Sequence, residues 1–208
     1  MEYKFDLQVH SEHSFDSDLS IDSIIKMSKK KGLSGVCITD HNTGLGSLEA
    51  FKKTRKDDFL AIPGTEICTQ YGDVIVMFIK EEIQTKDYYE IVEKAKEEDY
   101  ILNFPHPYRS HTNIENIAKD TDCIEIANGR SRLTQNLSAL YLQQNHGKTK
   151  TAGSDAHTLD EIGNCYTVFR DNTEESIRRD FKNGYTEVHG FFNTYKNIFK
   201  QFGKKYIK

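Results

Sequence analysis

The sequence has no long run of apolar residues, no closely spaced cysteines and no excess of positive charge. None of its apolar stretches approaches the ~18 residues that a membrane-spanning helix requires. The first ten residues, MEYKFDLQVH, lack the charged-then-apolar layout of a secretory signal peptide. We therefore expect a cytoplasmic protein that does not enter a membrane.

The cysteines are far apart, and none forms the C-x-x-C pairing of a zinc or redox motif. They stand at Cys37, Cys68, Cys123 and Cys165. Widely spaced single cysteines are most often small buried hydrophobes. We interpret all four as buried free thiols.

Length and charge limit the size of the protein and of its partner. With 208 residues, of which 37% are hydrophobic, the chain can bury one core of ordinary size, and we expect a single domain over 1–208. The formal charge of −4 makes it a poor candidate for gripping long duplex nucleic acid. A small or terminal substrate is favoured over a long polyanion.

Hydrophobic patterning predicts alternating strands and helices. In YKFDLQVH (3–10) the apolar Phe5, Leu7 and Val9 share one face of a strand, and the opposite face is polar. Ser20 can cap a helix that stops at Gly32. Further strand-like segments lie at 35–39, 59–67, 73–79, 100–107, 123–129, 150–157 and 165–171, mostly separated by helical patterns such as 85–99 and 173–184. This alternation predicts an α/β fold with a parallel sheet, closed or doubly wound.

Unusual polar residues fall at or just beyond the ends of these strand-like segments. They are His10, His41, Glu66, His106, Asp155 and His157. In a β/α barrel such ends gather at one rim, where active sites are built. Histidine and carboxylate ligands suit divalent ions such as zinc, manganese or iron. Two ions bridged by a carboxylate can activate a water and neutralise a phosphate oxygen, which is the chemistry of phosphoester hydrolysis.

Six motifs in order resemble those of the PHP (polymerase and histidinol phosphatase) family. They are DLQVHSEHSFDS, ITDHNT, IPGTEI, NFPHPYR, IEIANGR and GSDAH, and they run from Asp6 to His157. The resemblance implies a distorted seven-stranded, TIM-like β/α barrel with two to three divalent metal ions (Mn, Zn or Fe) at its rim. It places one ion on His10, Glu66 and Asp155 with Gln8, a second on Glu66 and His106 with Asn128, and a third on Asp16, His41 and His157.

The resemblance also implies a reaction. Family members cleave phosphomonoesters, and some relatives are exonucleases, so the fold does not identify the substrate. We expect a metal-dependent phosphoesterase that hydrolyses a small phosphomonoester or nucleotide by metal-activated water, with Glu66, Asp155 and His157 as catalytic residues. Arg109 and Arg130 start from the expected rim and are predicted to bind phosphate. A metal-dependent nuclease is the alternative enzyme, with nucleic acid as a less favoured partner.

Gln8 departs from the family pattern, which has histidine at this place. An amide oxygen is a weaker and harder ligand than imidazole. Either the first metal binds more weakly, or the site runs on the other ions, or the protein is a catalytically impaired metal-binding or regulatory module. His13 is read as a residue facing substrate or solvent rather than as a substitute ligand. Asp6 and Asp40 either orient ligands or satisfy backbone groups.

The last segment, residues 190–208, contains five lysines and no acidic residue. Its apolar residues recur at helical spacing, and they are Phe191, Tyr195, Ile198 and Phe202. This pattern predicts a helix that packs on the barrel with its lysines outward. The alternative is a basic amphipathic tail that binds a partner, a membrane surface or nucleic acid.

Overall fold

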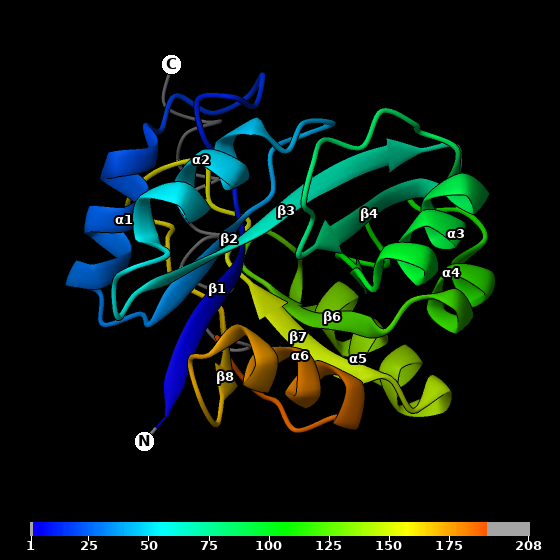
Figure 1. Cartoon of the computed structure of the whole chain (residues 1–208). Coiled ribbons are helices and arrows are strands. Elements are labelled where there is room, and N and C mark those ends of the chain that lie inside the picture. The colour runs from blue at the N-terminus through cyan, green and yellow to red at the C-terminus, as the bar shows by residue number, and fades with distance from the viewer. Residues whose placement is uncertain (1, 191–208) are drawn as a thin grey trace, which may run out of the picture.

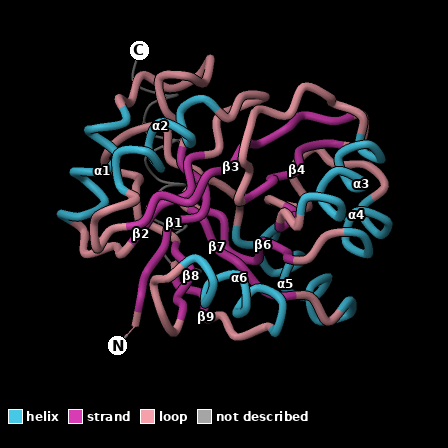
Figure 2. Tube along the Cα trace, in the orientation of Figure 1, coloured by secondary structure: helices cyan, strands magenta, loops and turns pink. Residues whose placement is uncertain are grey.

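Residues 2–190 are described by the structure, which is a computed structural model of the chain. A nine-stranded sheet runs in the order β7-β6-β5-β4-β3-β2-β1-β8-β9. The strands are β1 (Tyr3–Val9), β2 (Gly35–Ile38), β3 (Leu60–Thr69), β4 (Gly72–Met77), β5 (Ile101–Phe104), β6 (Cys123–Asn128), β7 (Thr149–Gly153), β8 (Tyr166–Phe169) and β9 (Glu187–His189). The strands gather at the centre of the molecule and the helices lie around them (Figure 2).

The sheet curls until β1 meets β7. Val9 forms a parallel bridge with Ala156, just beyond β7, and the His10 N–H donates to the Ala156 carbonyl at 2.9 Å. Strands β1 to β7 thus form a nearly closed ring, while β8 pairs antiparallel with the first residues of β1. The predicted α/β barrel is confirmed, although the sheet has nine strands where seven were predicted.

One strand of the ring reverses direction. Strands β3 and β4 form a hairpin whose turn includes Gly72 at a φ of +120°, a conformation that favours glycine. Consequently β4 runs antiparallel to both β3 and β5. The prediction of a parallel sheet is therefore wrong for β4 and for the added pairs of β8 and β9.

The helices cover the outside of the ring (Figure 1). They are α1 (Ile21–Lys30), α2 (Leu45–Thr54), α3 (Tyr88–Glu98), α4 (Ile114–Asp120), α5 (Leu133–His146) and α6 (Glu174–Asn183). The predicted cap of the first helix is confirmed, because the Ser20 side chain accepts a hydrogen bond from the first turn of α1. Asp87 and Thr173 cap α3 and α6 in the same way, within the segments predicted to be helical. No helix within residues 2–190 is both long enough and apolar enough to cross a lipid bilayer.

The first strand changes face partway along its length. Phe5 and Leu7 pack inside the ring with residues of β3 to β5, whereas Val9 packs outside with α1 and α2. A register shift between Asp6 and Val9 in the pairing with β2 accounts for this switch. The prediction that Phe5, Leu7 and Val9 share a face is therefore wrong, and the shift lets Gln8 and His10 point into the ring near its rim.

Two further predictions concern the thiols and the tail. Cys37, Cys123 and Cys165 are buried as predicted, whereas Cys68 is exposed on β3. The helix predicted over 190–208 lies outside the described residues except for Gly190. The single-domain boundaries of 1–208 stay a prediction.

Candidate metal centre

The predicted ligands converge at one rim of the barrel, at the ends of different strands. Gln8 is in β1, Glu66 in β3 and Asn128 at the end of β6, while His10, Asp16, His41, His106, Asp155 and His157 lie in the segments that follow β1, β2, β5 and β7. All but Asp16, His41 and His157 are buried. Parallel strands with a common direction thus bring together residues that are distant in sequence.

His10 stands between two carboxylates. Its Nε2 atom lies 3.3 Å from Glu66 Oε2 and 3.2 Å from Asp155 Oδ1. Donor atoms bound to one ion at ~2.1 Å are about 3–3.5 Å apart, so His10 Nε2 lies at the separation of a fellow ligand from each of these two carboxylate oxygens. His41 Nδ1 approaches the same Glu66 oxygen at 3.6 Å.

Asp16 joins the two remaining histidines. Its Oδ2 atom lies 3.4 Å from His41 Nε2 and 2.9 Å from His157 Nε2. His157 Nδ1 is 2.9 Å from the Asp155 carbonyl oxygen, to which it donates, so Nε2 is the ring nitrogen that would bind an ion beside Asp16. Together with His10, these residues bring four ligand atoms within 4.8 Å of one another.

The donor set on this side of the cluster fits a divalent cation. Among the described residues, His10 Nε2 and Glu66 Oε2 are buried atoms without a hydrogen-bond partner. Burial alone would lower the pKa of His10, but the carboxylates of Asp155 and Glu66 outweigh burial and raise that pKa to about 10. A cation is therefore strongly favoured among these groups, and a metal ion would satisfy both unpartnered atoms.

Two of the predicted ligands have unusual backbone conformations. His106 and Asp155 have φ values of +28° and +56°, which residues other than glycine rarely adopt. Such a conformation costs on the order of 1–3 kcal/mol and persists only where surrounding contacts enforce it. The Asp155 N–H donates to the Gln8 carbonyl at 2.9 Å, and the His106 N–H donates to Glu125 Oε2 at 2.8 Å. Both contacts aim these side chains into the cluster.

The other side of the cluster is filled by hydrogen bonds. Glu66 Oε1 lies 3.1 Å from Gln8 Nε2 and 3.0 Å from His106 Nε2. Asn128 is adjacent, but its Oδ1 atom faces the main chain of residues 130 and 131. Gln8 and Asn128 therefore lie at the cluster, but neither side-chain amide oxygen faces Glu66 or His106.

The two predicted phosphate-binding arginines lie at the rim and are paired. Arg109 Nη2 is 2.7 Å from Asp155 Oδ2, and Arg130 Nε is 3.4 Å from Glu161 Oε1. His13 turns instead toward Glu49 of α2, at 3.7 Å. Both arginines are thus placed beside the cluster, whereas His13 points away from it.

Buried carboxylates support the ligands from behind. Asp6 accepts hydrogen bonds from Ser154 and from the Gly163 N–H, and Asp40 accepts two from Ser11. These aspartates therefore accept hydrogen bonds from main-chain groups, as one of the two hypotheses predicts. Ser154 and Ser11, which they hold in place, directly neighbour Asp155 and His10. Burial opposes the charged form of Asp6 and raises its pKa to about 6.

Glu125 is a site residue that the sequence reasoning missed. It is buried in β6, its pKa is raised to about 8 by burial, and it accepts hydrogen bonds from the His106 N–H and from Asn128 Nδ2. A carboxylate in the apolar segment CIEIAN was the available signal. Its contacts hold the segment that carries His106.

A second group of metal-binding residue types is found among residues 2–190, formed by Asp73, His106 and His111. His111 Nε2 accepts a hydrogen bond from the Asp73 N–H at 2.9 Å. This contact already uses one ring nitrogen to fasten the 106–111 segment to β4, so we assign no ion to this group.

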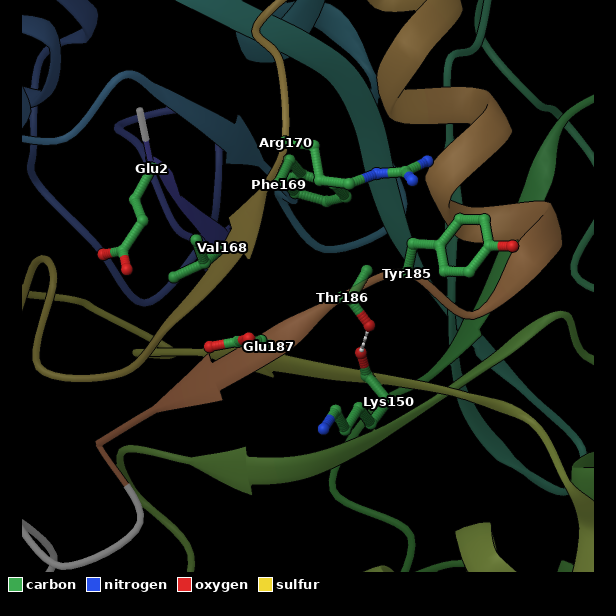
Figure 3. A pocket seen from close by; sticks show the side chains of 8 residues that line it. All are labelled: Glu2, Lys150, Val168, Phe169, Arg170, Tyr185, Thr186 and Glu187. Carbon is green, nitrogen blue, oxygen red and sulfur yellow. Dashed lines mark hydrogen bonds between the residues drawn. The ribbon is translucent and has the colours of Figure 1, made fainter.

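A separate hollow lies at the opposite end of the barrel (Figure 3). It is lined by Glu2, Lys150, Val168, Phe169, Arg170, Tyr185, Thr186 and Glu187. Glu2 precedes β1 and Lys150 is near the start of β7, whereas the candidate ligands follow the ends of those strands. Arg170 forms an ion pair with the buried Asp180 and stacks on Tyr185 at 4.1 Å, so its charge is already used in contacts within the fold.

The barrel and its rim of histidines and carboxylates define a member of the PHP domain family, and the chain matches this family over residues 6–204. An uncharacterized protein of Methanocaldococcus jannaschii is 33% identical over 178 residues, which cover 80% of this chain and 70% of that protein. A second uncharacterized protein of the same organism is 35% identical over 116 residues, covering 50% of this chain and 68% of that protein.

A solved structure shares the fold. It is a two-domain protein from Bacteroides vulgatus that contains a predicted PHP-like metal-dependent phosphoesterase, with a TM-score of 0.78 and 18% identity. The match covers 91% of this chain and 65% of that protein, so the chain spans less than two thirds of its length. At this identity the likeness shows the fold alone.

Proposed function

We propose that this protein is a metal-dependent phosphoesterase that hydrolyses a small phosphomonoester or nucleotide. The observation that carries the proposal is the convergence of His10 Nε2, Glu66 Oε2 and Asp155 Oδ1 beside the Asp16, His41 and His157 group. Divalent ions held there would activate a water molecule and neutralise charge on the phosphate oxygens. Family membership supports the same class of reaction.

The chain's own residues supply orientation and charge. Asp155 presents Oδ1 to the cluster, because its Oδ2 atom is engaged by Arg109. His157 presents Nε2, because its Nδ1–H is donated to the main chain. We assign Arg109 and Arg130 to binding the phosphate group of the substrate, since guanidinium groups match its oxygens and both stand at the rim.

The proposal is tested on the protein purified without chelator. Metal content is measured by elemental analysis, and hydrolysis of p-nitrophenyl phosphate is followed with added Mn²⁺ or Zn²⁺. We expect bound metal and metal-dependent turnover, both reduced in Asp155→Asn and His41→Ala. Absence of turnover with any ion would overturn the proposal. Faster cleavage of single-stranded DNA than of phosphomonoesters would instead favour a nuclease.

A further inference from the structure

The orientation of the Asn128 side chain is fixed by two main-chain groups that can act only as hydrogen-bond donors. Its Oδ1 atom accepts hydrogen bonds from the Arg130 N–H at 2.9 Å and the Ser131 N–H at 3.0 Å. A main-chain N–H can only donate, so the amide oxygen must face these two groups. The Asn128 amino group therefore points the other way, into the cluster.

The orientation of Asn128 in turn fixes the orientation of the Gln8 side chain. Asn128 Nδ2 donates to Gln8 Oε1 at 3.1 Å and to Glu125 Oε2 at 3.0 Å. Gln8 consequently turns its own amino group to Glu66 Oε1, at 3.1 Å, and to His106 Nε2, at 3.4 Å. Reversing Gln8 would bring its oxygen against the Glu66 carboxylate and its amino group against that of Asn128. Both contacts would be repulsive in a buried site.

An amide nitrogen donates hydrogen bonds and does not ligate a metal ion. We propose that the Gln8–Asn128 amide pair closes the second metal position, the one otherwise formed by Glu66 Oε1, His106 and Asn128. In place of an ion, the Gln8 amino group donates to Glu66 Oε1 and lies against His106 Nε2. The ions are confined to the other side of the cluster, where Glu66 Oε2 and His10 Nε2 have no hydrogen-bond partner. The inference rests on the proposed function only for the presence of those ions.

Metal stoichiometry tests this proposal without any activity measurement. The proteins are saturated with Mn²⁺, passed through a desalting column and analysed for metal per chain. We expect at most two ions in the wild type and about one more in Gln8→His, because imidazole can present a lone pair to the second position. Gln144→His, an exposed change of the same kind on α5, controls for metal captured by an added histidine and should match the wild type.

Asn128→Asp is the second variant, in case Gln8→His does not fold. One aspartate oxygen can accept from Arg130 and Ser131 while the other faces Gln8, so Gln8 is free to turn its oxygen toward Glu66. This variant should also gain an ion. Three ions in the wild type, or no gain in whichever variant folds, would overturn the inference. Failure of the proposed function is distinct, because it would appear as absence of turnover whatever the metal count.

A second inference comes from Phe15, which lies on the solvent side of the segment between β1 and α1. Its side chain is 87% exposed, and its ring stacks on His41 with centroids 5.2 Å apart and an interplanar angle of 27°. The row of rings continues inward from His41 to His10 at 4.6 Å. The next residue, Asp16, is a candidate ligand. An apolar ring is thus presented beside the proposed phosphate position with one face free.

We infer that Phe15 is a stacking platform for a planar aromatic ring in the substrate, such as a nucleobase, which makes it a specificity-determining residue. This inference rests on the proposed function. Aromatic rings gain from offset stacking, and replacing a base-stacking aromatic residue by alanine typically weakens binding about 5- to 150-fold. A sugar or glycerol phosphate would gain little from the same surface.

Two readouts test the role of Phe15. Phe15→Ala should lower kcat/KM for adenosine 5′-monophosphate by about tenfold and leave that for β-glycerophosphate within about twofold. The chain has no tryptophan, so Phe15→Trp supplies a single fluorescent reporter. Its emission should be quenched by adenosine 5′-monophosphate and not by ribose 5-phosphate. Tyr141→Trp, exposed on α5, should show no such difference. Equal losses for both substrates, or equal quenching, would overturn the inference, and the fluorescence test holds even without turnover.

Discussion

Arg109 places its Nη2 atom 2.7 Å from Asp155 Oδ2, and the opposite oxygen of this carboxylate faces His10. The Arg109 side chain is about one third exposed, whereas Asp155 is buried. The positive charges of His10 and Arg109 outweigh burial and hold the pKa of Asp155 well below its usual range. Arg109 therefore both neutralises Asp155 and directs a single oxygen toward the cluster.

Replacing Arg109 by methionine should destabilise the metal-free protein by about 1–3 kcal/mol, because a buried carboxylate loses its partner. Saturating Mn²⁺ should remove most of this penalty, since a bound ion supplies the missing positive charge. Urea unfolding with and without metal measures both values. Lys182→Met, which breaks a surface pair with Asp99, serves as a control and should show no dependence on metal. An equal penalty for Arg109→Met in both conditions would contradict the assigned role.

Glu66 contacts both sides of the cluster, so Glu66→Gln should affect metal binding more than folding. The glutamine keeps the shape and loses the charge that attracts cations. We expect metal affinity to fall at least tenfold and kcat/KM to fall at least as much, since loss of an outer partner alone costs 10- to 100-fold. Metal titration and kinetics measure these changes, and circular dichroism checks the fold. The exposed Glu97→Gln on α3 should match the wild type, and so would Glu66→Gln if Glu66 were not a ligand.

The sequence was sufficient to predict the barrel and the gathering of ligands at one rim. Strand-like segments that end in His41, Glu66 or Asp155 need only a common strand direction to converge. The faces of β1 and β6 were harder to predict, because register shifts interrupt them, between Asp6 and Val9 and between Glu125 and Ala127. Strict alternation along a strand fails at such a bulge. Alternation therefore predicts the wrong face for Val9 and gives no reason to place Glu125 at the site.

The orientation of the Gln8 amide cannot be predicted from the sequence, for a different reason. Residue type shows that an amide carries one acceptor and one donor group, but not which of them faces a ligand. That choice depends on the Arg130 and Ser131 N–H groups, which reach Gln8 only through Asn128. Such a chain of contacts arises from the tertiary fold.

Cysteine reactivity gives a simple test of the fold. Burial raises the pKa of Cys37 and of the thiols of Cys123 and Cys165, so these groups are neither accessible nor ionised at neutral pH. Cys68 is the exposed cysteine. We expect a thiol reagent to titrate one group per native chain and four after denaturation in guanidinium. Cys68→Ser should remove the native signal, and two or more fast-reacting thiols would contradict the burial of the others.

Gly153 allows β7 to pass close to β1 beside the candidate metal centre. A Cβ atom there would lie 2.7 Å from Gln8 Cβ and 2.9 Å from the Gln8 main-chain nitrogen. Gly153→Ala should therefore move β1, lower the free energy of unfolding by about 1–3 kcal/mol and also reduce metal binding.

Gly147, at the end of α5, provides the matched control for this substitution. A Cβ atom at Gly147 meets nothing within 4 Å, but its φ of +60° disfavours other residues. Gly147→Ala should cost about 1–2 kcal/mol and leave metal binding unchanged. Urea unfolding and metal titration of both variants separate a steric effect at the centre from a conformational effect away from it. If Gly153→Ala bound metal as the wild type does, the close approach of β7 to β1 would not be what positions Gln8.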